Sequence, residues 1–317
     1  MEKCKTMLKD KLTGPESIVI QEGTGLSFII RLGGKLCGRN LSTPALTNQI
    51  IFFIDETMER SKCGRPLGMR SLAERRILVA DAYLGIYDVD FNTNTVKQLV
   101  SGGTEVDGKP IRFINDLDIV EDTIFFTHSS TRWDLFDLSY LRYRRLMAYD
   151  METDNLTVVL DNLHFPNGVQ ASRDEDELFV AETGMARILR VRLPLKSKPK
   201  GVIFLKNLHC LPDNIRLSMD ANLWVACAAV RTQSMLDWIT LKNLLQFIPR
   251  PLLVALMNMS YRYGLALLFD EQGRRLKALH DPDGKVVTEI SEVADNGTHL
   301  FFGSFRSKGL KYMQISS

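Results

Sequence analysis

The 317-residue sequence lacks any concentration of charge of one sign. Its 40 basic and 38 acidic residues leave a net charge of +2, and no long run of like charges occurs. Because nucleic-acid binding requires a concentrated basic surface, this balance indicates no nucleic-acid partner. The first residues are polar and basic with no apolar run behind them, so no signal peptide is visible.

Cysteine is also scarce. The five cysteines are Cys4, Cys37, Cys63, Cys210 and Cys227, and no two of them form a Cys-x-x-Cys pair. Their spacing therefore removes the usual zinc and thioredoxin interpretations. Composition alone leaves free thiols and a disulfide as open alternatives. A Gly-x-Ser-x-Gly motif is absent as well, so the sequence does not support a serine nucleophile.

No apolar run is long enough to span a membrane. The longest, residues 235–259, is interrupted by charged residues and by Pro249 and Pro251, whereas a transmembrane helix needs about 20 consecutive apolar residues. Its leucines recur at helix-like spacing. We predict an amphipathic helical insertion at 235–259, and two roles stay open for it: a cap on one end of the fold, or a lid or membrane-contacting element.

What the chain does contain is a recurring short motif. The segments 113–117, 165–169 and 211–215 each place an Asn beside a small or acidic residue, just ahead of an apolar run. Their asparagines, Asn115, Asn167 and Asn214, are 52 and 47 residues apart. A repeat of this length is typical of propeller blades or a similar array.

Short apolar segments separated by turn residues fill the intervals between these motifs, about four to each unit. Six units fit the length, and the first is short. We therefore predict an all-β fold, a six-bladed β-propeller over residues 14–317, with an incomplete first blade and the helical insertion in the fifth blade. Residues 1–13 are interpreted as a polar lead-in, and 37–63 as a loop or insertion. A β-sandwich is the alternative, but it would not explain the recurring Asn.

Equivalent positions of successive blades meet at the axis of a propeller, so the three amides are expected to converge. Together with Glu16 and Asp213 they offer oxygen ligands but only two formal negative charges. Such a set suits a hard cation such as Ca²⁺. A transition metal is disfavoured, because no His or Cys recurs at these positions. Asn-Gly and Asp-Asn are also common turn dipeptides, and a purely structural turn is the alternative.

His128 stands at the end of an apolar strand-like run and can act as a general base near the axis. A strand-end residue with a local hydrogen bond is the alternative. The other four histidines, His164, His209, His280 and His299, are left without a role. Four Asn-x-Ser/Thr sequons, at Asn40, Asn155, Asn258 and Asn296, lean towards the secretory pathway.

Several longer motifs resemble the strictosidine synthase-like propellers, and most closely the adipocyte plasma membrane-associated protein family. They cover nearly everything after residue 13. The motifs are GPESI (14–18), CGRPLG (63–68), LVADAYLGIYDV (78–89), FINDL (113–117), FPNGVQ (165–170), VAETGMARI (180–188), PDNIR (212–216), SMLD (234–237), LHDPDG (279–284), ISEV (290–293) and FFGSFRS (301–307).

The resemblance implies a six-bladed propeller related to paraoxonases, hydrolysis of aryl esters, and a type II membrane protein of the secretory pathway. It implies a central calcium ion that polarises the ester carbonyl while a base activates water. The implied ligands are Glu16, Asn115, Asn167, Asp213 and Asn214. It also implies a disulfide between Cys37 and Cys63. Strictosidine synthase condenses an amine with an aldehyde, and its catalytic glutamate falls near Ser291 and Glu292, where the match is loose.

The chain departs from the family pattern at three places. Leu67 and Asp81 stand where paraoxonases carry a histidine pair, so Asp81 or His128 is the predicted catalytic base. Family members carry an N-terminal transmembrane helix that is not seen here, so we expect a truncated product or a fragment. The first blade lacks a Gly-rich strand pair, and the 37–63 loop is longer than usual, which could misplace Glu16.

The sequence thus predicts a calcium-dependent, arylesterase-like hydrolase that acts on a small-molecule ester. The alternative is a non-catalytic propeller that uses calcium structurally and binds a protein or lipid partner. Oligomeric state stays open.

Overall fold

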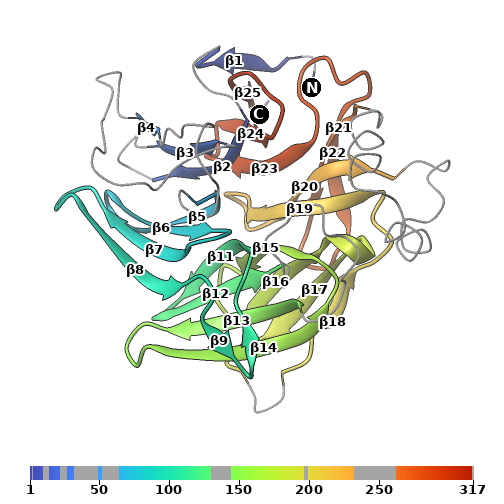
Figure 1. Ribbon diagram of the computed structural model, residues 1–317. Helices are drawn as coiled ribbons and strands as arrows, with labels where there is room; N and C mark the ends of the chain where they lie inside the picture. Colours follow the sequence, from blue (N-terminus) through green and yellow to red (C-terminus); the bar gives the residue numbers. More distant parts are fainter. Residues whose placement is uncertain are drawn as a thin grey trace, which may run out of the picture.

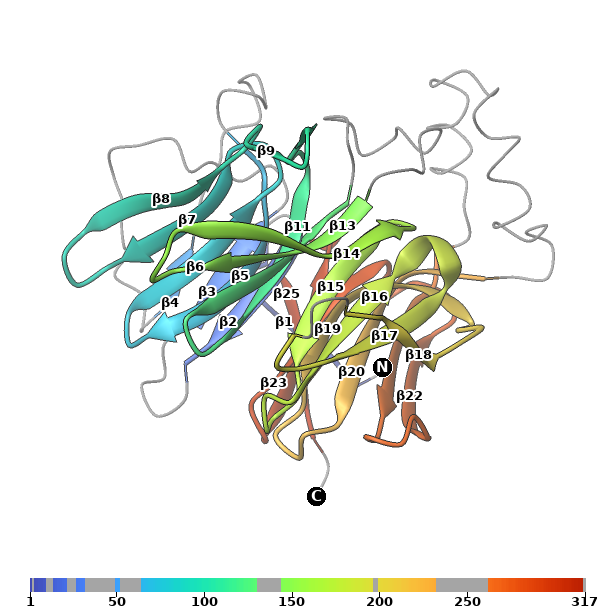
Figure 2. The same ribbon diagram turned by 90° about the horizontal axis from the view of Figure 1, so that it is seen from below.

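The computed structural model describes residues 1, 3–9, 14–21, 27–31, 49–51, 64–129, 144–195, 199–231 and 262–315. These residues form six sheets arranged around a central axis, besides one small two-stranded hairpin (Figure 1). Seen from the side, the sheets are twisted and lie face to face around that axis (Figure 2). Within the described part, one turn of 3₁₀ helix, η1 (Thr183–Met185), is the only helical element. The predicted all-β propeller is confirmed.

Four sheets are complete blades of consecutive antiparallel strands. Blade 2 contains β5 (Pro66–Ala73), β6 (Arg76–Asp81), β7 (Gly85–Asp90) and β8 (Thr95–Ser101). Blade 3 contains β11 (Ile114–Val120), β12 (Thr123–His128), β13 (Arg144–Asp150) and β14 (Asn155–Leu163). Blade 4 contains β15 (Pro166–Ala171), β16 (Glu177–Glu182), β17 (Arg187–Arg192) and β18 (Val202–Leu205). Blade 5 contains β19 (Cys210–Leu217), β20 (Leu223–Val230), β21 (Gly264–Phe269) and β22 (Arg275–Asp281). The small hairpin between blades 2 and 3 is β9 (Glu105–Val106) with β10 (Lys109–Pro110).

Blade 6 takes strands from both ends of the chain. It contains β23 (Ile290–Asp295), β24 (His299–Ser304) and β25 (Leu310–Gln314), and β1 (Lys5–Met7) pairs antiparallel with β25 as its outer strand. Both chain ends accordingly lie at this blade (Figure 1). Residues interpreted as a polar lead-in therefore contribute a strand that ties the start of the chain to its end.

Among the described residues, blade 1 has three strands, β2 (Pro15–Ile20), β3 (Ser27–Arg31) and β4 (Gln49–Ile51). This agrees with the prediction of an incomplete first blade. β4 pairs parallel to β3, whereas the pairs in the other blades are antiparallel. β4 is a strand inside the segment that was interpreted as a loop. The Cys37–Cys63 disulfide and the helical insertion at 235–259 lie outside the described residues.

The inner strands of the six sheets form a closed ring. β2, β5, β11, β15, β19 and β23 each contact the next, and β23 returns to β2. Six apolar clusters fill the interfaces between neighbouring sheets. Among the described residues, the clusters that flank blade 1 lie around Met69 on one side and Ile18 on the other. The hydrophobic effect thus stabilises every interface of the ring.

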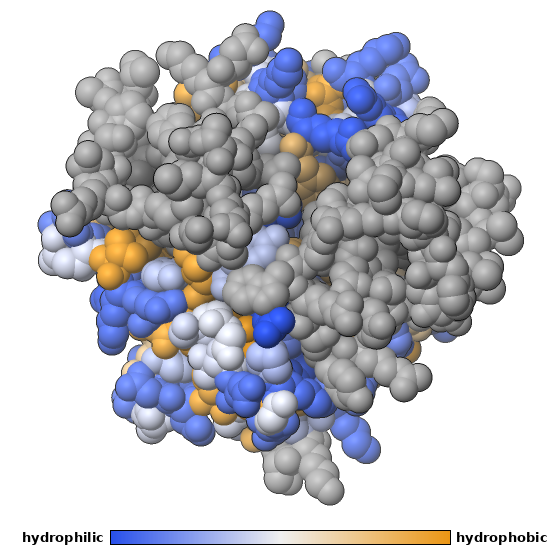
Figure 3. Space-filling model, in the orientation of Figure 1, coloured by the Kyte–Doolittle hydropathy of each residue, from blue (hydrophilic) through white to orange (hydrophobic). Residues whose placement is uncertain are grey.

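The described surface carries no large apolar patch on the face seen in Figure 3, where hydrophilic residues surround small, separate hydrophobic groups. No helix of the described part is long and apolar enough to cross a membrane. The segment 235–259, for which membrane contact was predicted, lies outside the described residues.

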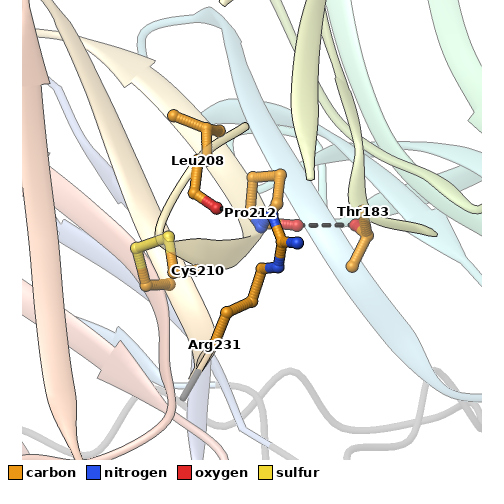
Figure 4. Close-up of a disulfide and its surroundings, with 6 residues drawn as sticks. Thr183, Leu208, Cys210, Pro212 and Arg231 are labelled. Atoms are coloured by element: carbon orange, nitrogen blue, oxygen red, sulfur yellow. Dashed lines mark hydrogen bonds between the residues drawn. A yellow bond between two sulfur atoms is a disulfide. The ribbon is translucent and has the colours of Figure 1, made fainter. Parts of the chain in front are cut away.

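A disulfide joins Cys210 at the start of β19 to Cys227 in β20 (Figure 4). Both cysteines are fully buried. Among the described cysteines Cys4 is free. Composition left thiols and a disulfide open, and this pair resolves the question because the two strands are neighbours in one sheet.

Candidate metal centre

Each of the six inner strands has a two-residue bulge at the same place, near its first residue. The bulged pairs are Glu16–Ser17, Leu67–Gly68, Asn115–Asp116, Asn167–Gly168, Asp213–Asn214 and Ser291–Glu292. A bulge sets two residues opposite one on the partner strand and redirects their side chains. The repeated motif in the sequence is therefore this bulge, and all five predicted ligands stand at one level around the axis.

We call Glu16, Asn115, Asn167, Asp213 and Asn214 the ligand ring; all five are buried. The Asn167 amide hydrogen-bonds the Asp213 carboxylate, and the charge of Glu16 acts on Asp213. Asn214 Nδ2 donates to Glu292 Oε2 at 3.2 Å. The fold thus brings blades 1, 4 and 5 into one polar cluster, and the register places Asn115 beside it.

Three oxygens of the ligand ring are buried with no hydrogen-bond partner among the described residues: Glu16 Oε2, Asn167 Oδ1 and Asn214 Oδ1. A buried acceptor left without a partner costs about 1–3 kcal/mol, so such groups are rare unless a ligand satisfies them. The nitrogens of both amides bond carboxylates, and this leaves the two amide oxygens for another partner.

Burial raises the pKa of Glu16 to about 7; the Arg65 charge opposes this, and Glu292 adds to it. Burial also raises the pKa of Asp213 well above its ordinary value, and the neighbouring charge of Glu16 adds to the effect. Both shifts have the same meaning: the site disfavours its own negative charges. A bound cation would reverse that penalty.

A second layer of charged residues lies immediately next along the same strands, and we call it the ion-pair layer: Arg70, Asp116, Asp118, Arg216 and Glu292. Arg216 Nη1 bonds Asp116 Oδ2 at 2.7 Å, and its Nη2 bonds Glu292. Arg70 Nε bonds Asp118 Oδ1 at 2.9 Å. All five residues are buried.

Backbone groups complete the ion-pair layer. Glu292 accepts the Ile18 N–H at 2.7 Å and the Ser17 hydroxyl at 3.0 Å. Asp116 Oδ2 accepts the Val169 N–H at 3.1 Å. Every inner strand contributes at least one group, so the layer links all six blades. The loose match of Glu292 to a catalytic glutamate has a structural explanation, because its carboxylate is fully used in these contacts.

The two layers together are short of positive charge. They contain five carboxylates, those of Glu16, Asp116, Asp118, Asp213 and Glu292, against the guanidinium groups of Arg70 and Arg216. Arg65, whose charge acts on Glu16, adds a third cation. If all five carboxylates are ionised, the remaining formal deficit is two positive charges. No group of three or more His, Cys, Asp and Glu side chains in the described residues is placed to hold a metal, so a site here must use amide oxygens.

The two predicted catalytic residues, Asp81 and His128, lie at the ends of second strands rather than in the ligand ring, and both are fully buried. Asp81 Oδ1 accepts the backbone N–H groups of Tyr83 and Leu84, each at 2.9 Å, which caps a turn. Burial raises the pKa of Asp81. His128 Nδ1 accepts a hydrogen bond from Arg145 Nε at 3.4 Å. These contacts give both residues a role in the fold, and their catalytic role stays a prediction.

An apolar cluster of Leu67, Ala82, Tyr83 and Phe113, with Phe165 packed against it, borders the ligand ring. Leu67 occupies the ring position of β5. Phe113 and Phe165 stand two residues before Asn115 and Asn167 and have left-handed φ angles of 55° and 53°. Bulky residues rarely adopt that conformation, and such strain concentrates at functional sites.

Sequence reasoning missed the ion-pair layer. A signal existed, because Asp116, Asp118 and Arg216 lie one to three residues beyond the motif asparagines that had been aligned.

Comparison with known proteins agrees with this architecture. A family model described as strictosidine synthase matches residues 115–194. The adipocyte plasma membrane-associated protein of Salmo salar is 37% identical over 336 residues, which cover 100% of this chain and 79% of that protein. The protein of the same name from Rattus norvegicus is 36% identical over 340 residues, which cover 100% of this chain and 87% of that protein.

Solved structures show the same fold at low sequence identity. A gluconolactonase from Xanthomonas campestris superposes with a TM-score of 0.65 at 18% identity, over 99% of this chain and 89% of that one. A calcium-binding protein, regucalcin, from Agrobacterium tumefaciens gives a TM-score of 0.53 at 12% identity, over 78% of this chain and 75% of that one.

Proposed function

This chain belongs to the adipocyte plasma membrane-associated protein family, and from that premise we propose that it is a calcium-dependent hydrolase of carboxylic ester bonds, with aryl esters as its substrate class. The observation that carries the proposal is the set of three buried oxygens without partners, on Glu16, Asn167 and Asn214. Calcium takes six to eight oxygen ligands from carboxylates, amides and water, which is the donor set that the ligand ring offers.

Calcium bound there would polarise the ester carbonyl and stabilise the negative charge that develops on its oxygen. The protein's own part is to orient the donors. Asp213 holds the Asn167 amide, and Glu292 holds the Asn214 amide, so each turns an oxygen away from its carboxylate partner. Contacts of this kind behind a ligand commonly account for 10–100-fold in metal affinity.

The apolar cluster would form one wall of the substrate-binding site. Phe165 is partly buried and packs against Leu67 and Phe113 beside the ligand ring. Apolar and aromatic walls with a few convergent polar groups are typical of small-molecule sites. An aryl group that lies against Phe165 would exclude water next to the ester carbonyl, where a low dielectric strengthens electrostatic stabilisation.

Phenyl acetate hydrolysis tests the proposal. Turnover is measured for the wild type with excess calcium and after a calcium chelator, and for Asn167→Ala against Asn155→Ala, an exposed amide on β14. We expect the chelator and Asn167→Ala to abolish turnover and Asn155→Ala to leave it unchanged. Activity that persists in both the chelator and Asn167→Ala contradicts the metal mechanism. A sugar lactone, as a cyclic ester, is a useful second substrate, since a gluconolactonase shares the fold.

A non-catalytic propeller with structural calcium is the second candidate, and one observation favours it: both predicted bases, Asp81 and His128, are fully buried and engaged in the fold. Calcium would then raise the melting temperature by mass action without any ester turnover. Such a result would direct attention to a protein or lipid partner.

A secretory-pathway or membrane-associated location is proposed as well. The relatives are named plasma membrane-associated, and the buried Cys210–Cys227 disulfide suits an oxidising compartment. Alkylation of the protein in its native cells before and after reduction tests this: Cys210 and Cys227 should be modified only after reduction and unfolding.

A further inference from the structure

His164 and Glu182 form a hydrogen-bonded pair beside the ligand ring. His164 Nδ1 lies 2.9 Å from Glu182 Oε1, and the same oxygen accepts the backbone N–H of His164 at 2.7 Å. The Glu182 side chain is completely buried, whereas that of His164 is 33% exposed. An ionised carboxylate only accepts hydrogen bonds, so Nδ1 must carry the proton in the neutral ring. Nε2, on the other side of the ring, is then the basic nitrogen.

The pair lies between two ligand-bearing bulges. Glu182 is the cross-strand partner of Pro166, the residue next to Asn167. The following residue, Thr183, donates its hydroxyl hydrogen to the carbonyl oxygen of Pro212 at 2.6 Å (Figure 4). Pro212 directly precedes Asp213. His164 therefore lies at the rim of the candidate centre, where β15 meets β19, and one residue from Phe165 of the apolar cluster.

The carboxylate of the pair is held ionised. Burial opposes the charge of Glu182, but hydrogen bonds from His164 and Arg187 outweigh burial and lower the pKa of Glu182. Arg187 Nε lies 2.5 Å from Glu182 Oε2. The Arg144 guanidinium lies 5.2 Å from the centre of the Phe165 ring, so a second described cation lies near this rim.

We propose that His164 is the general base of the ester hydrolysis and that Glu182 positions it; this inference rests on the proposed function. His164 Nε2 takes a proton from a water molecule, and the water oxygen forms a bond to the ester carbonyl carbon. The bond from that carbon to the leaving oxygen then breaks, and the proton passes from Nε2 to the leaving oxygen. One ester and one water give one carboxylic acid and one alcohol, and His164 returns neutral. A carboxylate that fixes the ring tautomer is the arrangement of the serine protease histidine–aspartate pair.

The paired variants His164→Gln and His209→Gln test the role. Gln at 164 keeps a donor for Glu182 but has no basic nitrogen, and His209 is an exposed histidine just before β19. With phenyl acetate and saturating calcium, we expect His164→Gln to lower kcat by about 100-fold or more and to leave KM within about twofold. His209→Gln should behave as the wild type. The acidic limb of the wild-type kcat/KM profile against pH should vanish in His164→Gln, and imidazole should partly restore turnover to His164→Ala.

Two further readouts separate a base from a merely structural residue. Glu182→Gln should lower kcat and displace the acidic limb, while calcium still raises the melting temperature. Nitrogen-15 spectroscopy of the imidazole should show the Nδ1–H tautomer of His164, whether or not turnover is detected. An active wild type with unchanged kcat in His164→Gln, or a His164 ring in the Nε2–H tautomer, overturns the inference alone. A wild type inactive on phenyl acetate and lactone overturns the proposed function and the inference together.

Discussion

The ligand ring and the ion-pair layer are neighbours on the same six strands, yet they treat buried charge in opposite ways. In the ion-pair layer Arg216, Asp116 and Glu292 satisfy one another and the surrounding backbone. In the ligand ring, one residue away, carboxylate and amide oxygens of Glu16, Asn167 and Asn214 have no partner in the described part of the chain. The bulge on β11 shows the division within one strand, because Asn115 belongs to the ligand ring and the next residue, Asp116, belongs to the ion-pair layer.

The difference teaches how to tell a structural polar cluster from a binding site. Buried charges that are all paired stabilise a fold, because removing one member of a pair leaves the other as an uncompensated charge in a low dielectric. Buried acceptors that converge without donors make sense only with a ligand. The same six strands thus carry both an ion-pair layer that links the blades and a set of oxygen donors suited to a ligand, and the following experiments probe the boundary between them.

Arg216→Met should have the largest effect. It removes the only guanidinium that bridges Asp116 and Glu292 among the described contacts, and loss of one partner of a buried pair costs about 3–5 kcal/mol. Urea unfolding measures the loss of unfolding free energy in Arg216→Met. Arg275→Met is the control, because Arg275 is exposed on β22. The cost should be the same with and without calcium. A loss of unfolding free energy no greater than that of Arg275→Met would mean that the ion-pair layer does not stabilise the packing of the blades.

Calcium should stabilise the wild type by about 2.7 kcal/mol at a concentration 100-fold above its Kd. Asn167→Ala should lose most of this gain, and Asn155→Ala should keep it, because only Asn167 belongs to the ligand ring. Chemical denaturation with calcium and with a chelator measures the difference. An equal gain in both variants would place the ion elsewhere.

The effect of Glu16→Gln on the free energy of unfolding should have opposite signs without and with calcium. The pKa of Glu16 is raised from an ordinary 4.5 to about 7, so between these values the folded calcium-free protein keeps a proton that the unfolded chain has lost. Its stability therefore falls as the pH rises from about 4.5 to 7. At pH 8 we expect Glu16→Gln to stabilise the calcium-free protein by roughly 3 kcal/mol, and to weaken the calcium-dependent gain.

Unfolding curves at pH 5 and pH 8, each with calcium and with chelator, measure this prediction. Asp116→Asn is the matched variant in the ion-pair layer and should destabilise under all four conditions, because Arg216 and Arg70 then lose a charge partner. Destabilisation by Glu16→Gln in the chelator would mean that both layers are structural.

Ser17→Ala should have the smallest effect, about 1 kcal/mol, because it removes one of several hydrogen bonds to Glu292. Ser17 shares a bulge with Glu16 but serves the other layer. Its cost should therefore be independent of calcium, with the exposed Ser101→Ala as the control. A cost that appears only with calcium would show that the layers are coupled through this bulge.

Much of this architecture could be read from the sequence. The asparagine motif and the spacing of about 50 residues predicted the blades, because a bulge at each inner strand demands similar residues at similar intervals. The incomplete first blade was predicted because the strand pattern fails between Cys37 and Cys63. The residues of the ligand ring were chosen for the same reason, and the fold places them at one level.

Other features could not be read in this way. Pairing of Lys5–Met7 with β25 joins residues about 300 apart, and nothing local marks so short a strand. The Cys210–Cys227 pair depends on which strands are neighbours. The sequence alone assigns His164 no role, because Glu182, its hydrogen-bond partner, lies 18 residues away in the chain.

The sequence by itself determined the repeat, the strand content and the chemical kind of the axial residues, because these depend on local spacing and residue type. Only the tertiary structure decided which of those polar atoms have partners. Satisfaction of a buried oxygen depends on donors that arrive from other blades, as Arg216 reaches Asp116 and Ile18 reaches Glu292. The oxygens that no donor of the described residues reaches define the candidate metal centre, and this arrangement arises only when the ring closes.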